Sequence, residues 1–307
     1  MIVAIVGSIH MDFYIRLPKL PVPGETVLGH GFTMLPGGKG ANQAVACSRL
    51  GAYTYMVGRV GNDIFGEKLI ENFRKNNVDT KYIEVDKTTH TGIAFILLDE
   101  KTGENMITVA PGADYNVSAK DVDNAMDAIS RSDILLLQLE IPIDTVVYAA
   151  KRAWEKGVRV ILNPAPAASL PDEIYRYIHV LTPNRVEASL LTNINIESRE
   201  DAVKAGKLLI DKGVDYVIIT LGAEGSMVIS KDFVRHIPAY KVEVVDTTGA
   251  GDAFNAALAV SLAEGKDIVE ACRIANAAAA LQITKLGAQS GLPTREELEE
   301  FLRKHRQ

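Results

Sequence analysis

The sequence predicts an α/β protein in which helices flank a mainly parallel β-sheet, with a small antiparallel sheet beside it. Three observations support this fold. Short apolar runs bounded by turn residues recur along the chain, as expected for strands that are buried on both faces. Segments with helical periodicity lie between several of these runs, which is the alternation of a parallel sheet. Two further stretches interrupt this alternation and have the pattern of strands with one solvent-exposed face.

The strands and helices of the parallel part are predicted in chain order. The runs expected to form strands are residues 2–7, 54–61, 133–140, 158–163, 179–184 and 216–222. The helical segments between them are residues 41–50, 65–76, 118–130, 144–156 and 199–212. The last third is predicted to be helical over residues 252–264, 268–286 and 294–305. No linker or low-complexity segment precedes this last third, and the length alone leaves the number of domains open.

The two interrupting stretches are residues 12–34 and 92–110, the second of which contains a predicted turn at residues 100–104. We expect them to pair into the small antiparallel sheet. A detached sheet of this kind can close over a ligand as a lid. Its apolar side chains would then be buried against that ligand or against a second copy of the chain, so we expect a homodimer.

The composition excludes several classes of protein. The chain has 307 residues, a net charge of -6 and no long Lys/Arg-rich run, so nucleic acid is not an expected partner. Cys47 and Cys272 lack CxxC spacing, which argues against a zinc site or a disulfide framework. Residues 1–7 are apolar without a basic leader, and no apolar run approaches the roughly 20 residues that span a bilayer. We therefore expect a soluble, cytoplasmic protein without a membrane partner.

Residues 244–255 form the first motif that carries chemistry, a predicted strand followed by a glycine turn and an apolar helix. Gly249 and Gly251 allow the backbone around Ala250 to approach a ligand, and the free N–H groups at the start of the helix form an anion site. Asp252 lies where it can accept a proton from a hydroxyl that attacks a phosphoryl group. The alternative is that Asp252 only caps the helix.

The second motif, residues 36–44, is a three-glycine turn that opens a helix with Asn42 and Gln43 in its first turn. An Asn side chain supplies a donor and an acceptor for adjacent sugar hydroxyls. The motif is not a phosphate-binding P-loop, because Gly40 and not Ser or Thr follows Lys39, and it is not a dinucleotide fingerprint. A purely structural turn with a helix cap is the alternative reading.

The two glycine motifs together resemble the paired signatures of the ribokinase-like (PfkB) carbohydrate kinases, and the resemblance runs along the whole chain. The other matching segments, in family order, are Gly7, Ser8 and Asp12, then residues 23–26, 138–140, 163–166, 182–184, Glu187, 220–222 and 287–289. The resemblance implies a single Rossmann-like three-layer α/β/α domain over residues 1–307, with a β lid. It also implies an enzyme that transfers the γ-phosphoryl group of ATP to the 5-hydroxyl of ribose.

The resemblance also assigns roles to particular residues. The sugar would be held by His10, Asp12, Gly38, Lys39, Asn42, Glu140 and Asp252, with Ala94 and Ile96 of the lid packed on it. ATP would be held by Asn184, Thr220, Gly222, Gly225, Gly251 and Asn276. Gly249, Ala250 and Gly251 would form the anion hole.

The resemblance implies metal ions as well. Asn184 and Glu187 would act through water on Mg²⁺, although Glu187 could instead be a solvated carboxylate in the first turn of a helix. A monovalent cation, usually K⁺, would lie beside the anion hole. Its ligands would be Asp246 and the carbonyls of Thr248, Gln282, Lys285 and Gly287, with Gly291 where ribokinases often have Ser.

His10 is the clearest departure from the family pattern, because ribokinases usually carry Asn at this position near the sugar 2-hydroxyl. A histidine still offers one hydrogen bond, so ribose remains the expected substrate, while deoxyribose, another furanose such as fructose, or a nucleoside stays open. His10 could also turn away from the sugar. Outside the enzymes, the alternative is a regulator that binds a sugar without catalysing a reaction. The presence of Asp252 and the glycine turn argues against this alternative.

Overall fold

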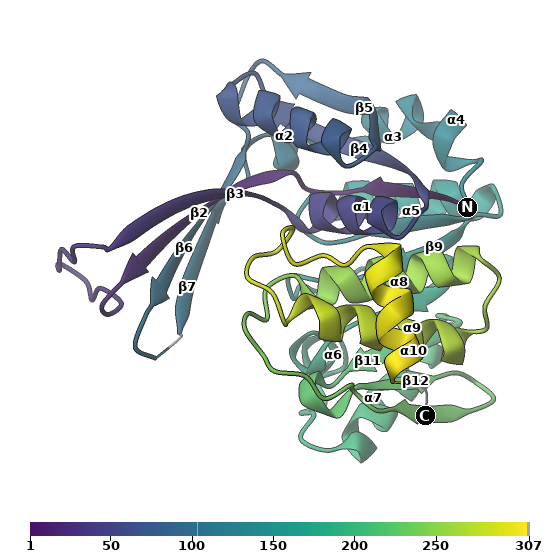
Figure 1. Cartoon of the computed structure of the whole chain (residues 1–307). Helices are drawn as coiled ribbons and strands as arrows, with labels where there is room; N and C mark the ends of the chain where they lie inside the picture. Colours follow the sequence, from purple (N-terminus) through teal and green to yellow (C-terminus); the bar gives the residue numbers. More distant parts are fainter. Residues whose placement is uncertain (103, 306–307) are drawn as a thin grey trace.

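The computed structural model describes residues 1–102 and 104–305. Gly103, which falls in the second predicted lid stretch, and Arg306 and Gln307, at the end of the predicted domain, lie outside the described residues. The body of the molecule is a large sheet between two layers of helices, and a small sheet projects from one side of it (Figure 1).

The large sheet has nine strands within the described residues. In order across the sheet they are β13 (Val234–Ile237), β12 (Ser226–Ile229), β11 (Tyr216–Thr220), β10 (Val180–Leu181), β9 (Arg159–Leu162), β8 (Ile134–Leu137), β1 (Ile2–Val6), β4 (Tyr53–Gly61) and β5 (Val78–Asp86). All neighbours from β5 to β11 run parallel, and only β12 and β13 are added antiparallel. The predicted mainly parallel sheet is therefore confirmed.

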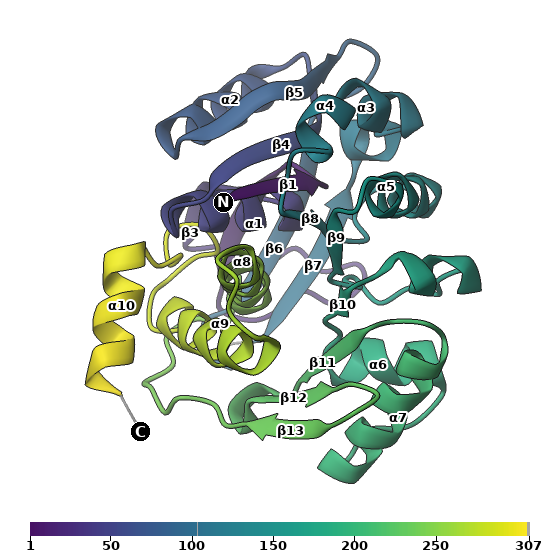
Figure 2. The same ribbon diagram turned by 90° about the vertical axis from the view of Figure 1, so that its right-hand side faces the viewer.

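Helices cover both faces of this sheet (Figure 2). One layer contains α1 (Lys39–Arg49), α2 (Ile64–Lys75), α8 (Ala250–Ala263), α9 (Ile268–Gln282) and α10 (Arg295–Lys304). The other contains α3 (Ala119–Asn124), α4 (Met126–Ile129), α5 (Ile143–Glu155), α6 (Arg185–Thr192) and α7 (Arg199–Asp211). Strand β1 shows why both layers form, because Val3 and Ile5 pack in one apolar core while Ala4 and Val6 pack in the other.

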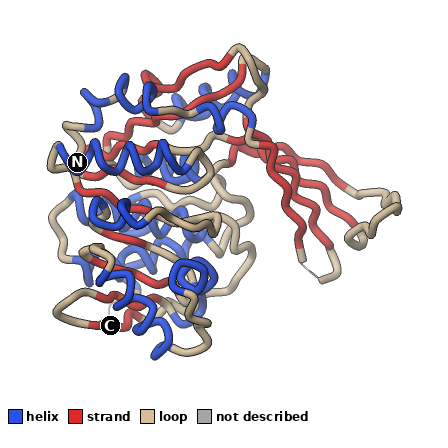
Figure 3. The backbone as a smooth tube through the Cα atoms, turned by 180° about the vertical axis from the view of Figure 1, so that it is seen from behind, coloured by secondary structure: helices blue, strands red, loops and turns tan. Residues whose placement is uncertain are grey.

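The small sheet contains β3 (Gly31–Gly37), β2 (His10–Leu17), β6 (Gly92–Asp99) and β7 (Asn105–Ala110), in that order. It extends away from the body as a flat arm, which Figure 3 shows from behind. Both outer pairs are antiparallel, whereas the central pair β2 and β6 runs parallel, a refinement of the expected arrangement. The two stretches predicted as a lid thus pair with each other, although they are distant in sequence.

The structure corrects several element boundaries. The helix expected over residues 118–130 is interrupted at Ala125 and forms α3 and α4, and α9 ends at Gln282 and not at Leu286. The sequence analysis did not predict β5, α6 and the hairpin of β12 and β13. It also did not predict the short 3₁₀ helices η1 (Gly112–Asn116), η2 (Asp172–Tyr177) and η3 (Gly222–Glu224).

Two further observations concern the cysteines and the helices. Cys47 and Cys272 are both buried and unbridged. None of the helices described has the length and apolar character that crossing a membrane would require.

Candidate active site

A cleft of about 290 Å³ opens at the carboxyl ends of the parallel strands, beside the N-terminus of α8. Open α/β sheets bind their ligands at this edge. The lining residues are Lys39, Asn163, Ala165, Thr182, Asn184, Glu187, Thr220, Thr247, Gly249, Ala250, Gly251, Asp252 and Asn255. Residues of both glycine motifs, far apart in sequence, thus meet in one cavity, as the proposed chemistry requires.

Asp252 is buried at this cleft and held by two side-chain amides. Asn42 donates from Nδ2 to Oδ2 of Asp252 at 2.9 Å, and Gln43 donates from Nε2 to Oδ1 at 3.0 Å. Burial raises the pKa of Asp252, an effect that the Lys39 ammonium and the two amide donors oppose. The N-cap of α8 is Gly249, and the Asp252 side chain makes no capping bond, so the helix-cap alternative is not supported.

The first turn of α8 leaves main-chain donors free. Gly249 has φ of 79°, a left-handed conformation that favours glycine, and it turns the chain into the helix. Within the described part of the chain, the N–H groups of Gly251 and Asp252 have no hydrogen-bond acceptor. A helix N-terminus with free N–H groups attracts anions. A phosphoryl group can therefore be stabilised beside the Asp252 carboxylate.

Lys39 and Glu140 connect the second glycine motif to the sheet. The backbone N–H of Lys39 donates to Oε2 of Glu140 at 2.8 Å, and the Ser8 hydroxyl donates to the same oxygen at 2.5 Å. Burial alone would raise the pKa of Glu140, but His10, Lys39 and these donors outweigh it, so the pKa is lowered. For Lys39, burial is likewise outweighed by nearby carboxylates, chiefly Asp252, and its pKa is raised.

His10 at the start of β2 forms a buried pair with Asp114 of η1. Its Nε2 lies 2.7 Å from Oδ2 of Asp114, and the two side chains are 3% and 0% exposed. Burial opposes the charge on His10, but the carboxylates of Asp114, Glu140 and Asp12, chiefly Asp114, together outweigh it and raise the pKa of His10. Burial likewise raises the pKa of Asp114, against the attraction of His10. The charged forms of the two side chains therefore stabilise each other.

Asp12 lies two residues further along β2, and β6 places Ala94 directly beside it. Ile96 pairs with Tyr14 on the same face, so both predicted apolar contacts of the lid lie on the Asp12 side of the small sheet. Burial raises the pKa of Asp12 to about 7. Gly37 accommodates this side chain, because a Cβ at Gly37 would lie 2.1 Å from Oδ2 of Asp12.

Asn184 and Glu187 form a capping box at the start of α6. The Asn184 amide oxygen accepts from the N–H of Glu187, and the Glu187 carboxylate accepts from both the N–H and Nδ2 of Asn184 at 2.8 and 2.9 Å. Glu187 is only 6% exposed, and burial raises its pKa. The alternative of a solvated first-turn carboxylate is therefore not supported, since Glu187 is buried and lines the cleft.

The other residues expected to hold ATP lie at the end of β11, in the turn that follows it and in the middle of α9. Thr220 lines the cleft and bridges to Asn184, and Gly222 begins η3. Gly225 has φ of 94°, and a Cβ there would lie 2.1 Å from the Ile237 carbonyl. Asn276 does not line the cleft, because its amide donates to Ile237 and Pro238 and thereby joins α9 to β13.

The residues expected to hold a monovalent cation gather behind the first turn of α8. The Asp246 carboxylate accepts from the N–H groups of Thr248 at 2.9 Å and Gly287 at 2.8 Å. The side chain of Gln282, and not only its main chain, enters this cluster and donates to the Thr248 carbonyl at 2.8 Å. The main-chain carbonyl of Gln282 accepts from the N–H of Lys285.

Sequence reasoning assigned no role to the residues that position Asp252 and His10, although Gln138 and Gln289 lie in segments that match the family. Gln138 donates to Gln43 at 2.6 Å, and Gln289 donates to Asn42 at 3.0 Å, so each amide that holds Asp252 is itself held. Asp114 was missed because nothing near it in sequence indicates a partner 104 residues away. The cleft residues Asn163 and Thr182 follow strands β9 and β10, and this position after parallel strands was the available signal.

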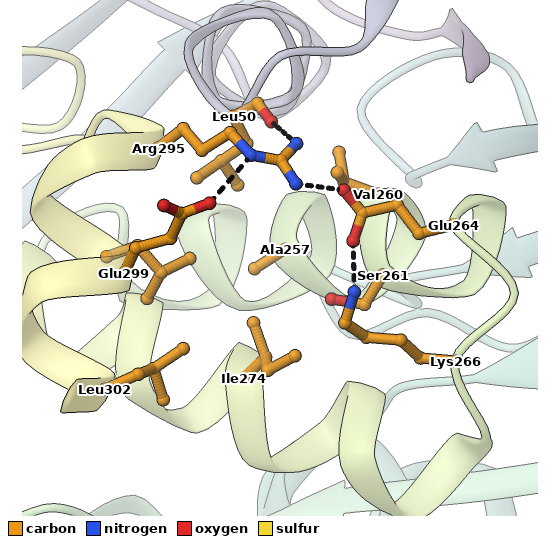
Figure 4. Close-up of a pocket in the computed structure, with 11 residues that line it drawn as sticks. Leu50, Ala257, Val260, Ser261, Glu264, Lys266, Ile274, Arg295, Glu299 and Leu302 are labelled. Carbon is orange, nitrogen blue, oxygen red and sulfur yellow. Dashed lines mark hydrogen bonds and ion pairs between the residues drawn. The ribbon is translucent and has the colours of Figure 1, made fainter.

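A second cavity, of about 140 Å³, lies between α8, α9 and α10 (Figure 4). Its walls include the apolar side chains of Ala257, Ile274 and Leu302, and an ion-pair chain from Arg295 through Glu264 to Lys266 borders it. The expected functional residues do not line it.

A buried carboxylate beside free N–H groups at the carboxyl edge of a parallel sheet defines a phosphotransferase for a small polar substrate. The comparisons with known proteins agree. The chain belongs to the pfkB family of carbohydrate kinases, whose model matches residues 2–295.

The chain is 45% identical over 98% of its length to the ribokinase of Bacillus subtilis, of which it covers 99%. It is 43% identical to the ribokinase of Haemophilus influenzae, with 97% of each chain covered. The solved structure of Arabidopsis thaliana ribokinase complexed with ribose and ATP matches with a TM-score of 0.91 and 34% identity over 98% of each chain. The family resemblance and the fold expected from the sequence are confirmed.

Proposed function

We propose that this chain is an ATP-dependent ribokinase, which phosphorylates the 5-hydroxyl of D-ribose to give ribose 5-phosphate. The observation that carries the proposal is the buried Asp252 carboxylate, which the side-chain amides of Asn42 and Gln43 hold in place. It lies beside the free backbone N–H groups of Gly251 and Asp252. Asp252 takes the proton of the attacking hydroxyl, and the N–H groups stabilise the negative charge on the moving phosphoryl group. The names of the relatives support ribose as the sugar and ATP as the donor.

The sugar is proposed to bind between Asp252 and the small sheet. Its hydroxyl partners there are Asp12, Lys39, Asn42, Glu140, His10 and the backbone at Gly38, with Ala94 and Ile96 covering the apolar side. Most of these groups are carboxylates and amides, which bind the paired donors and acceptors of adjacent hydroxyls. Closure of the small sheet would exclude water from the transferring phosphoryl group.

The nucleotide is proposed to lie along the ends of β10 and β11, in contact with Asn184, Thr220, Gly222, Gly225 and Gly251. Asn276, expected at the same site, is engaged with β13 and acts by holding the wall of this region.

Mg²⁺ fits beside Asn184 and Glu187. Each Glu187 oxygen accepts a bond from Asn184 and keeps lone pairs for water, which is how Mg²⁺ is usually held. The ion would neutralise charge on the phosphates when bound. A monovalent cation fits less well, because the Gln282 amide lies among the carbonyls that would hold it.

We also propose a homodimer through the small sheet. This sheet exposes Phe32, Met34, Met106, Ile107 and Val109 by 41–60% of their surface. Apolar side chains gathered on a thin arm favour burial against a second copy. Sedimentation at micromolar concentration should give a dimer, and a monomer would contradict this part alone.

The test of the proposed function is ATP consumption with a panel of sugars. Ribose should give the highest kcat/KM, and deoxyribose, fructose and inosine should give lower values. A higher kcat/KM with deoxyribose or inosine than with ribose would instead indicate a deoxyribose kinase or a nucleoside kinase, the alternatives that His10 leaves open. Absence of turnover with every sugar would support a sugar-binding regulator and contradict the enzyme.

A further inference from the structure

The side-chain amide of Gln282 lies among main-chain carbonyls from two loops. Its Nε2 is 2.8 Å from the Thr248 oxygen, 3.0 Å from that of Gly287 and 3.0 Å from that of Ala288. The Gln282 side chain is completely buried, at 0% exposure. Its Oε1 is also buried and makes no hydrogen bond within residues 1–102 and 104–305.

The chemistry of this cluster fixes the orientation of the amide. Three carbonyl oxygens that converge on one point need a positive or hydrogen-bearing partner, which a protein supplies as a cation or as N–H groups. If Oε1 faced them, four oxygens would meet without a proton between them. The NH₂ group must therefore point inward, although this leaves Oε1 without a partner at some cost in free energy.

The backbone at Gly291 lies in close contact with the Gln282 side chain. A Cβ at Gly291 would lie 2.7 Å from Nε2 and 3.0 Å from Cδ of Gln282. Any larger residue at Gly291 would therefore collide with the amide, so a serine ligand at this position and the glutamine side chain exclude each other.

We propose that the Gln282 amide takes the place of a monovalent cation in this kinase, so that the enzyme does not need K⁺. This proposal rests on the proposed kinase function. The amide joins the Thr248 loop, which leads into α8, to the loop at Gly287 and Ala288. Asp246 joins the same two loops through the N–H groups of Thr248 and Gly287.

The links that the Gln282 amide and the Asp246 carboxylate make between the two loops are formed by protein groups and do not require a cation. Thr248 directly precedes Gly249, which opens the first turn of α8, so the links hold the free N–H groups of that turn in position. Gln282 is a positioning residue, because it acts on the phosphoryl site through the Thr248 carbonyl.

The wild-type protein is tested first. The rate with ATP, Mg²⁺ and the best sugar is measured in KCl, NaCl and choline chloride at one ionic strength, and the melting temperature without ligands is measured in the same salts. The proposal predicts equal rates and equal melting temperatures. A clear rise of either quantity in KCl over choline chloride would overturn it.

The variant Gln282→Ala vacates the centre of the carbonyl cluster. In choline chloride its kcat should fall about tenfold, the factor that one or two ordinary hydrogen bonds represent. KCl should now restore most of the rate and raise the melting temperature, because a cation can occupy the vacated position. A variant that keeps the wild-type rate in choline chloride, or that K⁺ does not affect, would contradict the proposal.

Two further variants make the result specific. Thr284→Ala removes a hydroxyl that bonds the Leu281 carbonyl in the same turn and does not reach the cluster, so it should gain no response to K⁺. The double variant Gln282→Ala/Gly291→Ser adds a hydroxyl ligand and should respond to K⁺ more strongly than Gln282→Ala. If Gln282→Ala does not fold, the double variant decides, and its indifference to K⁺ would overturn the proposal.

The melting temperatures separate this proposal from the proposed function. If no sugar is phosphorylated, the kinase assignment fails, while the K⁺-dependent stability of Gln282→Ala still tests whether the amide stands in for a cation.

Discussion

Replacement of His10 by Asn tests the buried pair of His10 and Asp114 beside the proposed sugar site. The substitution removes the partner of Asp114, whose side chain is 0% exposed. A buried charge that loses its partner typically costs about 3–5 kcal/mol, and we expect a loss of about 3 kcal/mol in the free energy of unfolding at pH 8. Toward acid pH the loss should shrink, because burial raises the pKa of Asp114 and a neutral carboxyl no longer needs a charged partner.

The direction in which the free energy of unfolding changes at alkaline pH follows from the pKa of His10. Its pKa is raised in the folded protein, so the stability that the pair contributes is complete below the ordinary value of about 6.5 and is lost as pH rises through the raised pKa. The wild-type protein should therefore lose stability at alkaline pH more steeply than His10→Asn. The difference between the two proteins should be largest near pH 8 and smaller on both sides.

The assay is urea unfolding followed by circular dichroism at pH 5, 8 and 10. The matched controls are Asp114→Asn and the double variant His10→Asn/Asp114→Asn. The double variant should be more stable than His10→Asn at pH 8, because no unpaired charge remains. If His10→Asn lies within 1 kcal/mol of the wild type at every pH, where about 3 kcal/mol is expected at pH 8, the buried ion pair is not present as described.

Two other predictions concern single residues. Since the pKa of Asp12 is raised to about 7, its carboxylate is lost as pH falls below 7, and the KM for the sugar should rise there while that of Asp12→Asn stays flat. A KM that does not depend on pH would remove Asp12 from the sugar site. Gly225→Ala should lower the free energy of unfolding by several kcal/mol, about 1–2 from its left-handed backbone and the rest from collision with the Ile237 carbonyl. Gly157→Ala, with φ of 74° and nothing within 4 Å of the added Cβ, should show only the first effect, and equal losses would refute the collision.

The parallel core was predictable because its strands are continuous apolar runs. The run at β1 is buried on both faces and has no other reasonable interpretation. Strand β5 was missed because it is a half-exposed edge strand in which Asp79, Lys81 and Glu84 interrupt the apolar residues. The end of α9 was misplaced because Ile283 and Leu286 continue the apolar pattern beyond Gln282, where the helix ends.

The site was predictable only in part. Gly249 and the residues after it indicate an anion site through local chemistry, since a glycine turn before a helix exposes N–H groups. The partners of Asp252 come from Asn42 and Gln43, about 210 residues away, so only resemblance to a family could bring them together. The Gln282 side chain could not be anticipated at all, because the family pattern concerns only its main-chain carbonyl.

The variant Asp252→Asn tests the central claim most directly. The amide keeps the size of the side chain, and general-base removal typically costs about 10² to 10⁴ in rate. We predict that kcat with ribose falls at least about a hundredfold, while the affinity for the sugar stays within about tenfold. The melting temperature should fall by several degrees without loss of the fold, because the new NH₂ group faces the donor of Asn42 or of Gln43. A well-folded Asp252→Asn protein that turns over at the wild-type rate would show that Asp252 is not the base and would contradict the mechanism.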